Sequence, residues 1–221
     1  ENYRRLASAL DVDYDKFVFT DQTHTTNVRK VTAEDAGNGL TREREFHDTD
    51  GLITDVPGLV LSTFYADCVP LYFVDPVHRA IGLSHSGWRG TVNRMGKATI
   101  EAMRREYGSR PEELRCAIGP SICQDCYEVS GDVAVEFERA FAGHENEILI
   151  AKENGKYQLD LWKANEIVLL DAGVLPEHIE ITDICTCCNP DLLFSHRASH
   201  GKRLIECTET RDQPKNKERA L

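Results

Sequence analysis

The sequence predicts one α/β (α+β) domain in which helices flank a mixed β-sheet. Segments rich in β-branched and aromatic residues alternate with segments whose apolar residues recur every three or four positions, the periods of strands and amphipathic helices. The 221 residues suffice for one substantial core, and hydrophobic (41%) and charged (29%) residues are balanced as in ordinary globular proteins. No repeat, glycine-rich dinucleotide fingerprint or low-complexity linker divides the chain, so residues 1–221 are expected to form a single catalytic domain.

In the first half of the chain, strands predominate. A helix is expected over residues 1–10, where Leu6, Ala7 and Leu10 share one face, and the polar stretch 36–45 is expected to be a loop. Strands are expected at Phe17–Phe19, Leu59–Ala66, Leu71–Val74 and Ala80–Ser84.

In the second half, helices predominate. Thr91 is a suitable N-cap for a helix that runs to Tyr107, where Gly108 suits a left-handed C-cap. Further helices are expected from Ser130 to Gly143 and from Leu161 to Ala172, closed by Gly173, and a strand at Ile179–Ile184. Residues 211–220 are nearly all polar, and we expect them to fray.

Composition excludes several classes of partner. Asp and Glu number 37 against 26 Lys and Arg, for a formal net charge of −11, whereas nucleic-acid binding favours a basic surplus. No stretch approaches the roughly 18 apolar residues of a membrane span, and no signal peptide is evident at the start. We therefore expect a cytoplasmic protein whose eight cysteines are reduced and serve metal binding or catalysis. A monomer and a homodimer both remain open.

Reactive residues concentrate in three short blocks that each follow an expected strand. The blocks are Asp21–His24, Ala66–Pro70 and Ser84–Thr91. Loops after strands are where α/β enzymes place their sites. Two histidines and a thiolate, here His24, His85 and Cys68, form a familiar zinc set that leaves a fourth position for water or substrate. Because these residues are far apart in the sequence, an alternative stands: Cys68 as a small buried hydrophobe and both imidazoles bonded to backbone.

Motifs along nearly the whole chain favour the zinc site over this alternative. They are Ala66-Asp67-Cys68-Val69-Pro70, Gly82–Thr91, Ile118–Ile122, Cys126–Val129 and Phe194–Arg197, and Glu1–Leu6 adds a matching first helix. Together they closely resemble the signature of the laccase-domain family, also called the multicopper polyphenol oxidoreductase family, which includes bacterial purine nucleoside phosphorylases.

The resemblance implies a metal site and an activity. In that family the zinc ligands stand at positions that correspond to His24, Cys68 and His85. The implied reactions are phosphorolysis of adenosine, inosine and methylthioadenosine to base and sugar 1-phosphate, and deamination of adenosine. Purine nucleosides and phosphate are then the partners, and Zn²⁺ is the cofactor, although copper also binds such a ligand set.

Some positions depart from the family pattern. The family normally has a strand and a glycine-rich loop before its first helix, so the part of the site that this segment supplies near the substrate phosphate is expected to lie outside residues 1–221. The usual Gln-x-His-Gly reads Gln22-Thr23-His24-Thr25, and Ser86 replaces an alanine. Cys123 stands where the family often has a small residue.

Four other residues have both a functional and a structural interpretation. Arg89 is a candidate for binding phosphate or carboxylate, or ties the strand–helix corner to backbone carbonyls. Phe194 and Arg197 are candidates for stacking on a base and meeting phosphate, with core packing as the alternative for Phe194. For Asp67, a structural role is favoured over that of general base, because neighbours in an extended strand point to opposite faces.

The remaining cysteines raise the question of a second metal site. Cys123-x-x-Cys126 and the group Cys185, Cys187 and Cys188 suggest structural zinc, but the spacing within the second group is not that of a paired-knuckle ribbon. We therefore predict no second site, and a redox pair is favoured even less.

The function predicted from the sequence is a zinc-dependent purine nucleoside phosphorylase with adenosine deaminase activity. The rival enzyme is a copper polyphenol oxidase, but multicopper oxidases use His-x-His pairs and this chain has none. The non-enzymatic rival is a metal-bearing interaction module, which requires a closed four-ligand site instead of three ligands and an open cleft.

Overall fold

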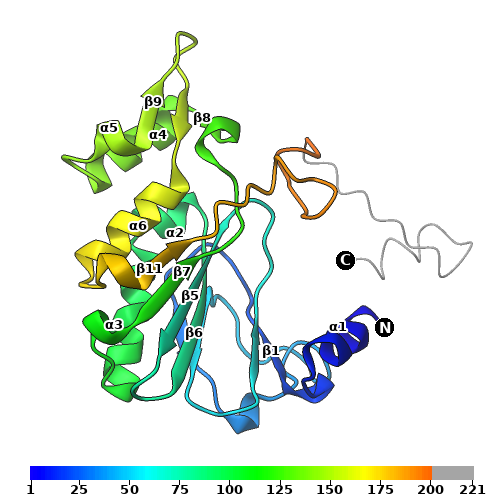
Figure 1. Ribbon diagram of the computed structural model, residues 1–221. Coiled ribbons are helices and arrows are strands. Elements are labelled where there is room, and N and C mark those ends of the chain that lie inside the picture. The colour runs from blue at the N-terminus through cyan, green and yellow to red at the C-terminus, as the bar shows by residue number, and fades with distance from the viewer. Residues whose placement is uncertain (201–221) are drawn as a thin grey trace, which may run out of the picture.

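The fold is built around a six-stranded mixed sheet. A computed structural model describes residues 1–200 of the chain (Figure 1). The strands, in spatial order, are β11 (Ile179–Ile181), β7 (Arg115–Ile118), β5 (Val69–Asp75), β6 (Ala80–Ser86), β3 (Gly51–Thr54) and β2 (Val28–Lys30). The two outer pairs, β11 with β7 and β2 with β3, are parallel, and all pairs between them are antiparallel.

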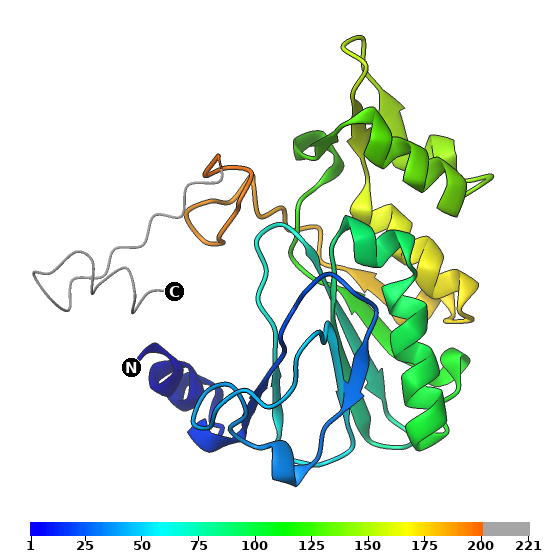
Figure 2. The same cartoon turned by 180° about the vertical axis from the view of Figure 1, so that it is seen from behind.

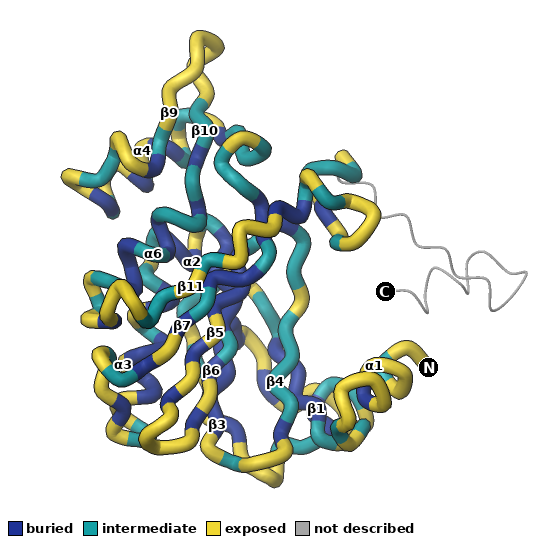
Figure 3. The backbone as a smooth tube through the Cα atoms, in the orientation of Figure 1, coloured by how far each residue is buried: buried dark blue, intermediate teal, exposed yellow. Residues whose placement is uncertain are grey.

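Helices cover one face of this sheet. They are α2 (Trp88–Val92), α3 (Met95–Tyr107) and α6 (Leu161–Asp171), seen together on one side of the sheet in Figure 2. Along β5, Val69, Leu71 and Phe73 are buried while Tyr72 and Val74 are exposed, which is the period-two pattern of a strand with one covered face. Figure 3 colours the buried residues dark blue, and many of them lie in the central strands. Apolar burial between sheet and helices thus forms the main core.

Two smaller layers complete the molecule. On the N-terminal side, α1 (Asn2–Leu10) packs against β1 (Phe17–Phe19), which pairs in parallel with β4 (Val60–Ser62). At the other end, β8 (Glu128–Val129), β10 (Tyr157–Leu159) and β9 (Leu149–Ala151) form an antiparallel sheet beside α4 (Gly131–Ala140) and α5 (Glu145–Ile148). Short 3₁₀ turns lie at Tyr14–Lys16, Ala33–Asp35, Pro111–Glu113, Gln124–Cys126 and Pro176–His178. Among residues 1–200, no helix has the length and apolar character needed to cross a bilayer.

A buried polar network fixes the end of β6. The Ser86 hydroxyl donates to Asn165 Oδ1 at 2.9 Å, and Asn165 Nδ2 donates to Thr91 Oγ1 at 3.0 Å and to the Leu161 carbonyl at 2.8 Å. The side chains of Ser86, Thr91 and Asn165 are fully buried, so their hydrogen bonds are needed to offset the lost contacts with water. The network connects β6, α2 and α6, and thereby holds the strand end that carries His85.

The α/β class with a mixed sheet is confirmed, and several expected elements are found: the first helix, β1, β5, β6, α4 and α6, with left-handed Gly108 and Gly173 after α3 and α6. Three boundaries are wrong. The expected strand 59–66 is only β4, because the chain leaves the ladder after Ser62, and the last strand ends at Ile181. The expected helix from Thr91 is two helices: Thr91 lies inside α2, and a left-handed Arg94 (φ 63°) separates α2 from α3. Residues 211–220 lie outside the described part.

Asp75 makes fold stability depend on pH. Its fully buried carboxylate accepts hydrogen bonds from the backbone of Val77 and His78 at 2.9 Å and pairs with His78 Nδ1 at 2.8 Å. Burial alone would raise the pKa of Asp75, but the hydrogen bonds outweigh it and keep the pKa below its ordinary value. A lowered folded-state pKa stabilises the fold above the unfolded-state pKa of about 4, and this contribution disappears as the pH falls through the folded-state value.

We therefore expect Asp75→Asn to lower the free energy of unfolding at pH 7 by about 1–3 kcal/mol, the range for hydrogen bonds to a charged group. The measurement is urea unfolding of both proteins at pH 7 and at several values below pH 4. The difference between them should shrink as the pH falls, and a difference independent of pH would contradict this role of the carboxylate.

Candidate metal centre

Three potential metal ligands from separate segments meet at one end of the central sheet. His24 lies in the loop between β1 and β2, Cys68 immediately precedes β5, and His85 is the penultimate residue of β6. Pro70 of β5 pairs in register with His85, which places Cys68 beside the end of β6. The ligand atoms of the three residues all lie within 4.8 Å of one another. The structure thus brings together the three residues that the sequence indicated.

The buried carboxylate of Asp50 orients His85. Nδ1 of His85 lies 2.7 Å from Oδ1 of Asp50, and both side chains are buried. An ionised carboxylate accepts hydrogen bonds only, so Nδ1 carries the ring proton and Nε2 keeps its lone pair. Metal-binding histidines commonly have such a partner, which fixes their tautomer and ring orientation. His85 is therefore prepared to bind a metal through Nε2.

The same carboxylate holds the loop that carries His24. Backbone N–H groups of Thr23, His24 and Thr25 donate to it at 2.9–3.1 Å, and Thr25 Oγ1 donates at 3.0 Å. Burial alone would raise the pKa of Asp50, but hydrogen bonds from His85 and from this loop lower it to about 2. His24 has a left-handed backbone (φ 66°), which these bonds hold in place. Asp50 is ionised at neutral pH and connects two of the three potential ligands.

The protonation states of His24 and Cys68 suit a cation. Burial, followed by the charge of His85, lowers the pKa of His24, so its imidazole is neutral and available as a ligand near pH 7. Burial, followed by the charges of Asp67 and Asp50, raises the pKa of the Cys68 thiol to about 11. A divalent cation provides the positive charge that stabilises the thiolate at neutral pH. A neutral imidazole and a thiolate stabilised by the cation together form a donor set that suits a divalent metal ion.

Gly87 provides space beside two of these side chains. A Cβ atom at position 87 would lie 2.9 Å from Cys68 Sγ and 3.0 Å from His24 Cδ2, well inside van der Waals contact. Cys68 and His24 can approach each other on this side only because residue 87 has no side chain. Since His24 is exposed and Cys68 is half-buried, the cluster is open to solvent on the side of His24.

Arg89 presents its charge near the cluster. Its guanidinium lies 4.2 Å from the ring of Trp88, and its charge contributes to the lowered pKa of His24. Within residues 1–200 its guanidinium has no hydrogen bond to a carbonyl, and both interpretations of Arg89 stay predictions. An exposed guanidinium in this place is suited to an anionic ligand.

Arg197 and Phe194 differ in their surroundings. The Arg197 guanidinium donates to the Glu128 carbonyl at 2.9 Å and lies 5.4 Å from the ring of Tyr127. Phe194 is 48% exposed, so the alternative of core packing is wrong for this residue. Within residues 1–200 no hydrogen bond or ring contact joins Phe194 to the metal cluster, and its role in stacking stays a prediction.

Two polar residues of the motifs have structural roles. Both oxygens of Asp67 accept hydrogen bonds at 2.7 Å, one from Thr186 Oγ1 and one from the backbone N–H of Arg197. This agrees with a structural role, although the reasoning from strand alternation is wrong, because Asp67 is left-handed (φ 86°) and precedes β5. The amide of Gln22, in the Gln-x-His motif, makes two hydrogen bonds of 2.7 Å to the backbone of Phe64.

The sequence motifs do not indicate two residues next to His85, Asp50 and Tyr65. Asp50 is preceded by the polar stretch His47–Thr49, and nothing in its neighbourhood distinguishes it from a loop aspartate. Tyr65, whose ring centroid lies 5.7 Å from that of His85, was assigned to a strand. An Asp–Gly step before an apolar strand, together with two histidines that need a partner, is the only signal that would have indicated Asp50.

The fold and the cluster define a metal-binding α/β protein, and comparison with known proteins identifies the family. The profile of the family described as "multi-copper polyphenol oxidoreductase laccase" matches residues 1–205. The purine nucleoside phosphorylase YlmD of Bacillus subtilis is 37% identical over 206 residues, covering 91% of this chain and 73% of its own length. The adenosine deaminase RL5 of an unknown prokaryotic organism is 36% identical over 193 residues, covering 87% and 73%.

A solved structure has the same fold as this chain. The crystal structure of the hypothetical protein YfiH of Bacillus licheniformis has a TM-score of 0.87 and 37% identity, and the match covers 91% of this chain and 76% of that one. The chain is an enzyme of the multi-copper polyphenol oxidoreductase laccase family.

Removing the charge of Asp50 should weaken metal binding. We expect Asp50→Asn to lower metal affinity about 10- to 100-fold, the usual effect of losing a carboxylate behind a metal-binding histidine. The measurement is competition with a chromogenic chelator. Asp75→Asn is the matched control, because Asp75 also pairs with a histidine but is the last residue of β5, at the end of the strand opposite Cys68. Equal affinities for both variants would contradict the role of Asp50.

Adding a methyl group at position 87 should also weaken metal binding, because the methyl group would occupy the space that Cys68 and His24 need. We expect Gly87→Ala to displace Cys68 or His24 and to reduce bound metal per chain, as measured by elemental analysis. Gly90→Ala is the control, because a Cβ atom there would meet nothing closer than 3.5 Å. Full metal content in Gly87→Ala would show that the two ligands do not need this space.

Proposed function

We propose that the chain is a zinc-dependent purine nucleoside phosphorylase that also deaminates adenosine. The observation that carries the proposal is the convergence of His24, Cys68 and His85 on one point that is open to solvent. Relatives named purine nucleoside phosphorylase and adenosine deaminase support the substrate class. Inosine, adenosine and methylthioadenosine with phosphate are the proposed substrates, and a nucleoside with water is the substrate pair for deamination.

Zinc is the proposed metal because two imidazoles and one thiolate are a common zinc set with one open position. Bound there, zinc supplies a Lewis acid at the open coordination position. Copper(II) also binds such ligands tightly, so the native metal has to be measured. Within residues 1–200, the only histidine-containing group of possible ligands is this one, and a cluster of several copper ions would need more histidines.

The residues around the cluster suggest how the substrates are held. Arg89 is the proposed phosphate-binding residue, because its guanidinium is exposed, free of protein acceptors in the described part and close to His24. Arg197 is fixed by Glu128 and Tyr127 and is proposed to line the same site. Phe194 is proposed to stack on the purine ring, which its exposed ring allows.

The rival functions predict different sites. A closed interaction module needs four ligands shielded from solvent, whereas this cluster has three ligands, of which His24 is exposed.

The proposed compartment for these reactions is the cytoplasm, where cysteines stay reduced. The seven cysteines in the described part are free thiols, which agrees with this proposal.

The decisive experiment is incubation of the metal-analysed protein with inosine and phosphate. We expect hypoxanthine and ribose 1-phosphate, and we expect adenosine with water to give inosine and ammonia. Cys68→Ala and His24→Ala should each lower both rates at least about a hundredfold, since a catalytic metal contributes several kcal/mol. His144→Ala is the control, because the side chain of His144 is partly accessible to solvent but pairs with Glu147 far from the cluster.

Arg89→Ala should separate the two reactions. If Arg89 binds phosphate, the variant should raise the KM for phosphate in phosphorolysis and leave adenosine deamination nearly unchanged. Equal losses in both reactions would assign Arg89 to the nucleoside instead. Dye oxidation by a zinc-only preparation, with inosine untouched, would favour the polyphenol oxidase.

A further inference from the structure

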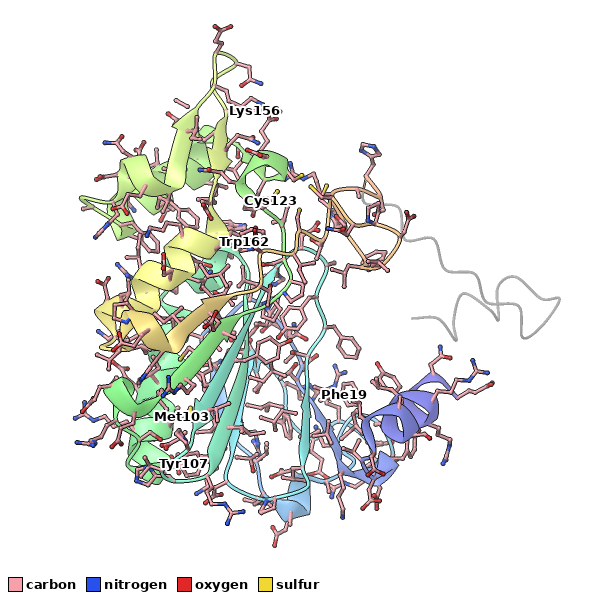
Figure 4. All side chains as sticks on the ribbon, in the orientation of Figure 1. Phe19, Met103, Tyr107, Cys123, Lys156 and Trp162 are labelled. Carbon is pink, nitrogen blue, oxygen red and sulfur yellow. The ribbon has the colours of Figure 1, made fainter. Side chains whose placement is uncertain are left out.

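Four cysteines outside the His24 cluster form a second group of thiols. Cys123 and Cys126 lie in the loop between β7 and β8, and Cys185 and Cys188 lie in the segment that follows β11. Their four Sγ atoms lie within 4.8 Å of one another. Figure 4 shows Cys123 where the loop after β7 faces the segment after β11.

The spacing of these residues is that of two zinc knuckles. Cys123-x-x-Cys126 and Cys185-x-x-Cys188 are each C-x₂-C, and Cys187 is not part of the group. The interpretation that the second group lacks the spacing of a zinc knuckle is wrong, because it counted Cys187 as a member of the pair. Tetrahedral thiolates around zinc lie about 3.8 Å apart, given Zn–S bonds of about 2.3 Å. Sγ of Cys126 and Sγ of Cys188 are 3.5 Å apart.

The backbone fixes the two loops against each other. Ser121 forms a parallel bridge with Cys185, with hydrogen bonds from Ser121 N to the Ile184 carbonyl and from Thr186 N to the Ser121 carbonyl, both 3.1 Å. These bonds continue the β7–β11 pairing beyond the ends of the strands. The thiols are brought together by the sheet itself and not by the chance packing of two surface loops.

Backbone N–H groups point at one of the sulfur atoms. The N–H of Cys188 lies 3.4 Å from Sγ of Cys185, three residues earlier, and the N–H of Cys123 lies 3.3 Å from the same sulfur. Such N–H groups stabilise a thiolate, the form of cysteine that binds a metal ion. Neutral thiols would gain little from this arrangement.

The charges around the group call for a cation. Four thiolates this close together repel one another strongly unless a cation lies between them. Within residues 1–200, the hydrogen bonds to these sulfurs come from backbone N–H groups and from another thiol, and none comes from a Lys or Arg side chain. A divalent ion removes the repulsion and completes the hydrogen-bonded arrangement.

We propose that Cys123, Cys126, Cys185 and Cys188 bind a second zinc ion in a closed tetrathiolate site. An iron–sulfur cluster is disfavoured because its cysteines bind different iron atoms and stand farther apart. The ion has no open position and serves structure. It fastens the segment in which Thr186 and Arg197 bond to Asp67, beside the ligand Cys68.

Zinc stoichiometry tests this proposal. The chain is purified from zinc-supplemented medium under reducing conditions, and zinc per chain is measured by elemental analysis. We expect Cys68→Ala, which removes a ligand of the first cluster, to retain one zinc. Cobalt exchanged into that variant should show the strong charge-transfer absorption of four thiolates. These measurements use a variant with all four cysteines intact, so they do not depend on whether the cysteine variants fold or on nucleoside activity.

A matched pair of cysteine variants sharpens the test. Cys126→Ser combined with Cys188→Ser should lose one zinc per chain and unfold at a lower temperature, whereas Cys187→Ser, a neighbouring cysteine outside the group, should keep the zinc content of the parent. Three results would overturn the proposal: no zinc retained by Cys68→Ala, iron in place of zinc in that variant, or a Cys126–Cys188 disulfide in protein kept under reducing conditions.

Discussion

An ionised carboxylate in a protein interior requires hydrogen bonds to compensate for lost hydration. Asp50 receives them from two segments that are distant in sequence, the loop of residues 23–25 and the ring of His85. The compensation of one charge therefore determines where both imidazoles lie, and Cys68 is added by the register between β5 and β6. The positions of the metal ligands therefore follow from the hydrogen bonds that stabilise the buried carboxylate of Asp50.

Much of the fold follows from local sequence periodicity, and the elements that could not be predicted depend on contacts with neighbouring strands or on an unusual backbone conformation. The stripe Met95, Thr99 and Met103 and the alternation along β5 reflect local periods, so both elements were predicted. β2 and β3 are short strands without alternation and β7 has only four residues, so all three depend on the hydrogen bonds that neighbouring strands supply. The break at Arg94 is likewise invisible in the sequence, because a left-handed arginine has no sequence signature.

The sites show the same division. Residue types and family motifs were enough to indicate His24, Cys68 and His85. Asp50 could not be found in this way, because its importance lies in contacts across more than one segment. The thiol group of the second site was within reach of the sequence, but counting Cys187 with its neighbours concealed the C-x₂-C spacing. The three-dimensional structure shows which four sulfurs meet, and the bridge between Ser121 and Cys185 shows how the two loops are aligned.

The β5–β6 hairpin has a bearing on how the centre assembles. The two strands are joined by the short turn of residues 76–79, so Cys68 and His85 meet as soon as this hairpin closes. His24 lies between β1 and β2, which must first pair with β4 and β3. This pairing closes a longer loop than the hairpin does and is therefore expected to be slower. Two of the three ligands are therefore brought together by a local hairpin, and the third depends on contacts between segments that are distant in the sequence.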